Sequence, residues 1–472
     1  MLLLLLPRAA RAGDPYLESY TITTPHFRVH YHSGLERVAQ RTAAIAERAN
    51  QLLTPQLGWR SSQITDVVIS DDSDSANGSA YGVPSNNISL FVSAPDDMSS
   101  LNDYDDWQVE LVTHEYTHIL HIDNMSGLPS IVNAILGKTL APNQAQPRWI
   151  LEGLAVAMES KNTSGGRLKS SLFDMYLRTD VLFGNLATLD EITQSPRRWP
   201  GGDLRYLYGS KFIEWIVDTY GPDTFARVAN DYGAFIIPWG INRSVRRATG
   251  HTYPELYQGW KATLEKRYRE QANAIAQRGL REGVRITHSG RIATAPHFVA
   301  PRCQSSAGSE LVYYRDDGIE RGGLYRVKLA PGPDDEAELL TRTSGSTLSL
   351  APDCSIYFDS VAPSRRRYFF NDLYRLPAGV RSENGQDARR QRLSVGARAR
   401  DPDVSADGKR IAYVTNDSGT TTLRLAELDA QGGLGRSRRV VAPRALRTSL
   451  HAALLARRQA HRVLGLEDWR LP

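Results

Sequence analysis

The hydrophobic period of the chain changes near residue 283, and this change limits the possible folds more than any other feature. Between about Asp106 and Gly279, apolar residues recur at helical spacing, with Pro and Gly at the interruptions. Earlier runs such as "HFRVHYH", "TDVVIS" and "NNISLFVS" alternate as strands do, and only short alternating runs follow residue 283. A chain of 472 residues is also too long for one ordinary core. We therefore expect an α+β protein, with a small β-sheet and a helical subdomain over 13–280 and a different domain over 283–472.

Three stretches of the second region repeat one pattern, a turn with Pro, Asp or Gly followed by a strand of alternating apolar residues. They are "APHFVAPRCQSSAGSELVYY", "LSLAPDCSIYFDS" and "DPDVSADGKRIAYVTND", and their spacing is roughly that of propeller blades. An unrelated β-sandwich is the alternative. The third stretch is similar to the "SPDGKxIAF" unit of TolB-like β-propellers, in which the Asp-Gly turn closes a hairpin. This resemblance implies β-propeller blades after residue 283, which would bind a protein partner or restrict access.

The two ends of the chain lead to expectations of their own. The run "MLLLLLPRAARA" resembles the end of a secretory signal, so we expect residues 1–12 to be a signal-peptide remnant and the protein to be periplasmic or secreted. A cytoplasmic terminus is the alternative. After about residue 447 the blade pattern stops. A synonymous spelling of these last codons, read one base later, gives the propeller unit again. We therefore hypothesise a frameshift there and an incomplete propeller, which resequencing of the gene tests.

The composition argues against several classes of protein. Hydrophobic residues make up 41% of the chain and charged residues 23%, as in soluble globular proteins. Charge interrupts every helical pattern before it reaches membrane-spanning length, so we expect no transmembrane helix. The net charge is +5, but the arginines are scattered rather than clustered with aromatic residues, so we expect no nucleic-acid partner. Cys303 and Cys354 leave the redox compartment open, and we expect two separate buried thiols rather than a disulfide bridge.

The stretch "LVTHEYTHILH" reads as a helix with two histidines on one face. His114 and His118 are four residues apart, which places their imidazoles about one helical turn apart. Two neutral imidazoles at this separation fit two corners of a tetrahedral Zn²⁺ site. Glu115 would lie beside such a metal, where a carboxylate is able to take a proton from water. The His-Glu-x-x-His pattern therefore predicts a metal-dependent hydrolase; histidines that serve only the core or the surface are the alternative.

A third ligand is predicted in "PRWILEGLAVAMES", downstream of the histidines. Its helical apolar stripe contains Glu152, and an unpaired carboxylate there would be unfavourable unless a metal neutralised it. The small residues Gly153 and Ala155 allow another helix to approach closely. An exposed helix carboxylate is the alternative. His121 shares the face of the two histidines, and we expect it to support or pack against the site, because a third ligand on the same helix would lie too far along it.

The motifs His-Glu-Tyr-Thr-His and Trp-x-x-Glu-Gly-x-Ala are similar to those of gluzincin metallopeptidases, in particular peptidase MA-like domains. The resemblance covers roughly residues 20–279. It implies a zincin-like catalytic domain that hydrolyses a protein or peptide substrate, with Zn²⁺ held by His114, His118 and Glu152 and with Glu115 as general base. The Gly-x-Met-Glu-Asn element of gluzincin aminopeptidases is absent from the sequence, which favours an endopeptidase.

The same resemblance implies a Tyr or His from a later helix that stabilises the oxyanion. The stretch "GGDLRYLYGSKFIEWIVDTYG" offers Tyr206 and Tyr208, and Tyr208 fits the family's Tyr-x-Ser-x-x-Phe pattern better. A tyrosine packed in a helical core is the alternative. We also expect "NNISLFVS" to be the edge strand along which an extended peptide adds by backbone pairing.

Two other functions are compatible with the sequence. One is a non-catalytic binding module that uses the propeller and keeps the peptidase fold as a scaffold. The presence of Glu115 argues against it, because a purely structural zinc site has no use for that carboxylate. The other is a zinc hydrolase of non-peptide amides or esters, which no feature of the sequence separates from a peptidase.

Overall fold

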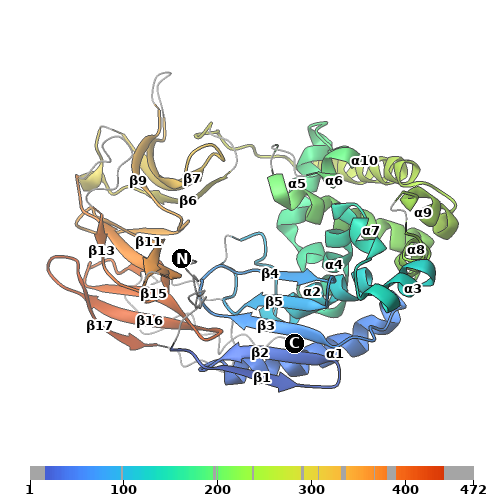
Figure 1. Cartoon of the computed structure of the whole chain (residues 1–472). Coiled ribbons are helices and arrows are strands. Elements are labelled where there is room, and N and C mark those ends of the chain that lie inside the picture. Colours follow the sequence, from blue (N-terminus) through green and yellow to red (C-terminus); the bar gives the residue numbers. More distant parts are fainter. Residues whose placement is uncertain are drawn as a thin grey trace, which may run out of the picture.

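The described part of the chain has two halves of different architecture, a mixed sheet with helices and then a series of antiparallel sheets (Figure 1). This arrangement confirms the predicted α+β class. The predictions for residues 1–12 and for the chain after about residue 447 lie outside the described residues. The structure, a computed structural model, describes residues 16–440 except 97–98, 195–197, 199, 237–238, 289–291, 307, 331–335, 366 and 380–389.

The first half begins with a five-stranded sheet in the order β1-β2-β3-β5-β4. The central strands β2, β3 and β5 are parallel, and β1 and β4 pair antiparallel at the two ends. The helix α1 (Glu36–Leu57) connects β2 to β3 and buries a stripe of alanines. The strands are Ser19–Thr23 (β1), Phe27–His32 (β2), Thr65–Ser70 (β3), Gly78–Tyr81 (β4) and Asn87–Phe91 (β5).

The strand predicted for "NNISLFVS" exists as β5, but its predicted place at the edge of the sheet is wrong. β5 lies between β3 and β4 and pairs with both. Its apolar residues Ile88 and Leu90 are buried in the core, as expected for an internal strand. The end of the sheet on this side is β4, a short strand of partly exposed residues.

The helices that follow the sheet confirm the predicted helical region. α2 and α4 pack against each other, and α4 makes its most extensive contact with α7. No helix in the described part of the chain is long and apolar enough to cross a membrane. The helices are Trp107–Asp123 (α2), Gly127–Leu136 (α3), Arg148–Asn162 (α4), Ser171–Leu182 (α5), Leu189–Thr193 (α6), Leu204–Tyr220 (α7), Thr224–Tyr232 (α8), Ile241–Thr249 (α9) and Tyr253–Gln277 (α10), with 3₁₀ turns at Pro142–Ala145 (η1), Arg167–Lys169 (η2) and Gly201–Asp203 (η3).

The second half contains three four-stranded antiparallel sheets that follow one another along the chain, β6 to β9, β10 to β13 and β14 to β17. Each of the three repeating sequence stretches contributes to a different one of these sheets. The strands are Ile292–Phe298 (β6), Glu310–Asp316 (β7), Gly323–Lys328 (β8), Glu338–Arg342 (β9), Leu348–Leu350 (β10), Ile356–Ser364 (β11), Tyr368–Leu376 (β12), Gln391–Arg392 (β13), Ala399–Val404 (β14), Arg410–Asp417 (β15), Thr420–Leu428 (β16) and Leu434–Arg439 (β17).

The two cysteines form a disulfide bridge, so the prediction of two separate thiols is wrong. Cys303 ends a short 3₁₀ turn, Pro301–Cys303 (η4), after β6, and Cys354 lies in the turn between β10 and β11. Their Cα atoms are 5.2 Å apart although 51 positions separate them in sequence. The bridge therefore joins the first of the three sheets to the second. Its formation depends on how neighbouring sheets pack, which the spacing of two cysteines does not reveal.

The two halves meet through a buried group of charges. Arg398, which precedes β14, pairs with Asp71 at 2.7 Å and with Asp74 at 2.8 Å, both just after β3. Asp74 also accepts a hydrogen bond from the backbone N–H of Asn371 in β12. A β-bridge between Ser73 and Phe369 lies beside these contacts. The antiparallel sheets are thus attached to the loop that follows the central strand of the first sheet.

Candidate metal centre

The helix α2 presents two histidines on the face that looks toward α4. Asp106 caps its N-terminus, and the side chain of Asp106 accepts a hydrogen bond from the backbone N–H of Val109. Nearly every residue of α2 is buried, so polar side chains on its inner faces require partners within the protein. His114 is buried, with 6% of its surface exposed, and His118 is partly buried. The two histidines are one helical turn apart.

Close packing between α4 and α7 fixes the position of Glu152. A Cβ added at Gly153 would overlap the backbone of Gly209 in α7, and a Cβ added at Gly209 would overlap the backbone of Trp149 in α4. The two glycines therefore allow the helix backbones to touch. The predicted need for a small residue at position 153 is explained by this contact. The adjacent Glu152 consequently projects from a rigid part of α4 toward α2.

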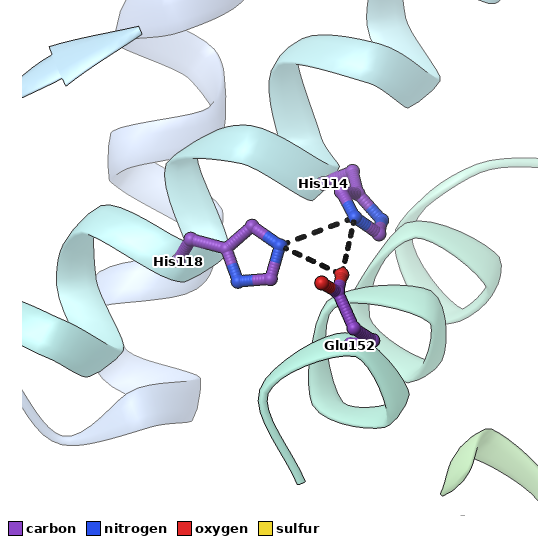
Figure 2. Close-up of side chains that lie close together, drawn as sticks. All are labelled: His114, His118 and Glu152. Carbon is purple, nitrogen blue, oxygen red and sulfur yellow. Dashed lines mark hydrogen bonds and ion pairs between the residues drawn. The ribbon is translucent and has the colours of Figure 1, made fainter. Parts of the chain in front are cut away.

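His114, His118 and Glu152 converge on one point between α2 and α4 (Figure 2). The two Nε2 atoms are 3.2 Å apart, and Oε2 of Glu152 is 3.7 Å from Nε2 of His114 and 3.3 Å from Nε2 of His118. A tetrahedral Zn²⁺ with ligands at about 2.0–2.2 Å requires ligand atoms separated by roughly 3.3–3.6 Å. The three side chains therefore fit a metal ion of this size, and the buried cluster is able to bind one.

The charges of the cluster reinforce this conclusion. Burial disfavours a charge on His114, but hydrogen bonds with Glu152 and Glu159 raise its pKa to about 9. Burial by itself would raise the pKa of Glu152, yet hydrogen bonds with His114 and His118 hold this pKa well below its ordinary value. A buried carboxylate is thus kept ionised by two imidazoles that face it. A metal cation placed among them would stabilise the ionised carboxylate in the same way.

A buried ion pair supports His114 from behind, and sequence reasoning missed it. Oε2 of Glu159 lies 2.7 Å from Nδ1 of His114, and the guanidinium of Arg167 donates hydrogen bonds to both carboxylate oxygens of Glu159 at 2.8 Å. Glu159 is 1% exposed. Its position two helical turns after Glu152 on α4 was the available signal, because a second carboxylate on that face must also lie toward α2.

A further carboxylate, Glu110, lies one helical turn before His114 and also lines the cavity. Burial and the nearby Glu159 raise the pKa of Glu110 to about 8. Its Oε2 atom has no hydrogen-bond partner in the described part of the structure. The deep end of the site therefore contains two carboxylates and one guanidinium.

Glu115 lies between the metal cluster and β4. Its side chain is 4% exposed and lines the same cavity as His114 and His118. A Cβ added at Gly78 in β4 would lie 2.7 Å from Oε1 of Glu115, so only glycine leaves space for this carboxylate. Burial raises the pKa of Glu115, and the two histidines oppose this effect without cancelling it. A carboxylate with a raised pKa binds a proton more readily than an exposed one.

The structure corrects the prediction for Tyr208 as the oxyanion group. Tyr208 is fully buried, its hydroxyl donates a hydrogen bond to Asp180 at 2.6 Å, and the backbone N–H of Ala187 donates to that hydroxyl. Tyr206 lines the cavity instead, with its ring centroid 6.4 Å from that of His114. Two residues apart on α7, the two tyrosines point to nearly opposite sides of the helix, so only one of them reaches the site.

His121 lies outside the group of three converging side chains. It is 3% exposed, and burial, followed by the effect of His118, lowers its pKa to about 4. This matches the expected supporting or packing role better than a ligand role. The cavity itself has a volume of about 560 Å³ and extends from β4 past the histidines to Glu110 and Arg167.

Comparisons with known proteins find only distant likenesses. No family model matches the chain. An uncharacterized protein of Treponema pallidum (strain Nichols) is 26% identical over 222 residues, which are 46% of this chain and 20% of that protein. The chain thus spans about a fifth of the length of this relative.

The solved structures that resemble this chain are also only distantly similar to it. The aminopeptidase A of Legionella pneumophila, solved in complex with aspartic acid, is 13% identical with a TM-score of 0.30, over 66% of this chain and 34% of that one. Puromycin hydrolase is 19% identical with a TM-score of 0.25, over 32% of this chain and 24% of that one. Neither likeness carries an argument about activity, which therefore depends on the geometry of the site.

Proposed function

We propose that this protein is a zinc metallopeptidase of the gluzincin type, acting as an endopeptidase. One observation carries the proposal: two histidines and a glutamate from separate helices converge at metal-ligand spacing, with a second buried glutamate beside them in one cavity. His114, His118 and Glu152 hold the ion. When bound, zinc supplies a Lewis acid that acidifies water and polarises a carbonyl group.

The remaining groups of the site have separate tasks. Glu115 accepts a proton at its carboxylate from the water that attacks the scissile carbonyl carbon, and then transfers this proton to the leaving amine. The raised pKa of Glu115 suits both steps, since a stronger base accepts the proton and a neutral acid delivers it. Tyr206, placed on the cavity wall, donates a hydrogen bond to the developing oxyanion.

The strand β4 provides the place for an extended substrate. It ends the sheet, and its residues from Gly78 to Tyr81 line the cavity next to Glu115. A peptide that pairs with the backbone of β4 would lie across the metal cluster with its side chains alternating between the cavity and solvent. We propose β4, in place of β5, as the strand for this pairing.

The three sheets of the second half are, in this proposal, blades of a TolB-like propeller that contacts a protein partner or limits access to the site. Their shared four-stranded antiparallel pattern supports this. A periplasmic or secreted location is supported by the Cys303–Cys354 disulfide, because such bridges persist in oxidising compartments.

Comparison of the wild type with Glu115→Gln tests the proposed activity. We expect about one Zn²⁺ per chain in both proteins by metal analysis, and a fall in peptide hydrolysis of about 10²–10⁴-fold in the variant, because the proton acceptor is lost. Gln keeps the size of the side chain, so the cavity beside Gly78 should be unchanged. Equal hydrolysis by both proteins would refute Glu115 as the base. A Glu152→Ala protein that retains full zinc occupancy would refute the third ligand.

A further inference from the structure

The helix α3 exposes an apolar surface that no other described element covers. Of its ten residues only Pro129 is buried, and none is charged. The exposed fractions of its large aliphatic side chains are 54% for Leu128, 58% for Ile131, 75% for Ile135 and 67% for Leu136. Scattered exposed aliphatic residues are ordinary on a protein surface, but four on one short helix indicate a surface that binds something.

A neighbouring loop enlarges this surface. The segment after α8 approaches the start of α3, where the backbone N–H of Ser126 donates a hydrogen bond to the carbonyl of Gly233 at 3.3 Å. In the same loop Ile236 is 41% exposed and Trp239 is 83% exposed. We call the combined surface the α3 face. It consists of Leu128, Ile131, Ile135, Leu136, Ile236 and Trp239.

Positive charge borders the α3 face on the side of α9. This helix carries three arginines and no acidic residue. The guanidinium of Arg243 lies 3.8 Å from the ring centroid of Phe235 in the same loop, and Arg246 is exposed one turn further on. Arg247 pairs with the carboxylate of Asp231 at 2.5 Å, and the charges of Arg243 and Arg246 also act on Asp231 and Glu255, respectively. Figure 1 shows α3, α8 and α9 together at one end of the molecule, away from the three antiparallel sheets.

We propose that the α3 face docks on the surface of an anionic lipid bilayer, with α3 lying in the plane of the interface. Exposed Ile, Leu and Trp side chains insert at the boundary of headgroups and acyl chains, and arginines beside them contact anionic headgroups. A protein partner would fit the aliphatic residues equally well. The three arginines of α9 outnumber the two carboxylates that face them, and α3 has no acidic residue; both features favour the membrane. The proposal is independent of the peptidase activity, since the α3 face does not include the metal cluster or its cavity.

Co-sedimentation with vesicles tests this proposal. The wild type should bind vesicles of phosphatidylglycerol and phosphatidylcholine in equal parts at least 10-fold more strongly than pure phosphatidylcholine vesicles. The double variant Ile131→Ser/Ile135→Ser should lose at least 10-fold in binding to both kinds of vesicle. Arg243→Gln/Arg246→Gln should lose the preference for phosphatidylglycerol. Ile319→Ser, at a position 91% exposed in the second half, is the matched control and should bind as the wild type does.

Two further measurements test whether the variants are folded and keep an intact site. Circular dichroism and hydrolysis of a soluble peptide should be the same for all variants, because every substituted side chain is exposed and outside the cavity. Failure of the wild type to sediment with anionic vesicles would overturn the proposal. It would also be overturned if the wild type were a dimer in solution that Ile131→Ser/Ile135→Ser converts to monomers, because a second copy would then cover the α3 face.

Discussion

Behind the His114 ring, the carboxylate of Glu159 is held by Arg167 in a buried pair. A hydrogen bond to the far nitrogen of a metal-binding imidazole fixes its tautomer and orientation, and loss of such a partner lowers metal affinity by about 10–100-fold. We therefore expect Glu159→Gln to weaken zinc binding by this factor, as measured by titration against a competing chelator. Glu214→Gln on α7 removes a half-exposed carboxylate outside the cavity and serves as the control. Unchanged affinity in Glu159→Gln would show that His114 needs no support.

At the scale of residues, the sequence identified the metal-site candidates whose positions follow the helical period. It did not identify residues whose role depends on how a helix is rotated in the fold. The spacing of His114 and His118 determines a common face, and Glu152 stands out as a carboxylate within an apolar stripe. The choice between Tyr206 and Tyr208 could not be made in this way. Both sides of α7 face protein, so its pattern does not show which side lies toward α2.

Among the elements, the contact of α4 with α7 controls the site most directly. Gly153→Ala would place a methyl group against the backbone of Gly209, and the helices would have to separate. Overpacking of this kind lowers the free energy of unfolding by about 1–3 kcal/mol, and the shift of Glu152 should weaken zinc binding as well. Thermal unfolding and zinc titration measure the two effects. Gly202→Ala, where an added Cβ meets nothing within 4 Å, is the control; a Gly153→Ala protein equal to it in both measurements would contradict the packing argument.

The elements themselves were largely predictable, but their order in the sheet was not. Alternation identified β2, β3 and β5 because their inner faces are buried. The position of β5 inside the sheet arises because β4, a strand without a clear apolar pattern, returns to pair with it. A strand without alternating apolar residues, such as β4, is hard to recognise in a sequence. Because β4 is present, it borders the cavity and β5 does not.

Across the whole molecule, Arg398 neutralises two aspartates between the two halves. Its side chain is 11% exposed, and those of Asp71 and Asp74 are 9% and 1% exposed. Removal of one partner from a buried group of charges lowers stability by about 3–5 kcal/mol. We expect Arg398→Gln to be destabilised by this amount and to unfold in two steps by calorimetry, since the halves would separate first. Arg436→Gln, on the exposed side of β17, should behave as the wild type does.

A triple variant tests whether the loss of stability in Arg398→Gln comes from unpaired charge or from lost packing. If the loss in Arg398→Gln comes from unpaired carboxylates, then adding Asp71→Asn and Asp74→Asn should recover much of the stability. No recovery would mean that the arginine acts mainly through its packing, for example over the ring of Phe370, 4.7 Å away. This contact between halves joins residues more than 300 positions apart, so no local pattern in the sequence indicates it.

The bridge between Cys303 and Cys354 encloses β7, β8, β9 and β10 in a covalent ring, which are three strands of the first antiparallel sheet and one of the second. A single backbone cut inside that ring would leave both fragments bound to each other through sulfur. A molecule cut there by a peptidase would therefore keep its two fragments together. The damage would become visible on a gel only after a reducing agent had opened the ring.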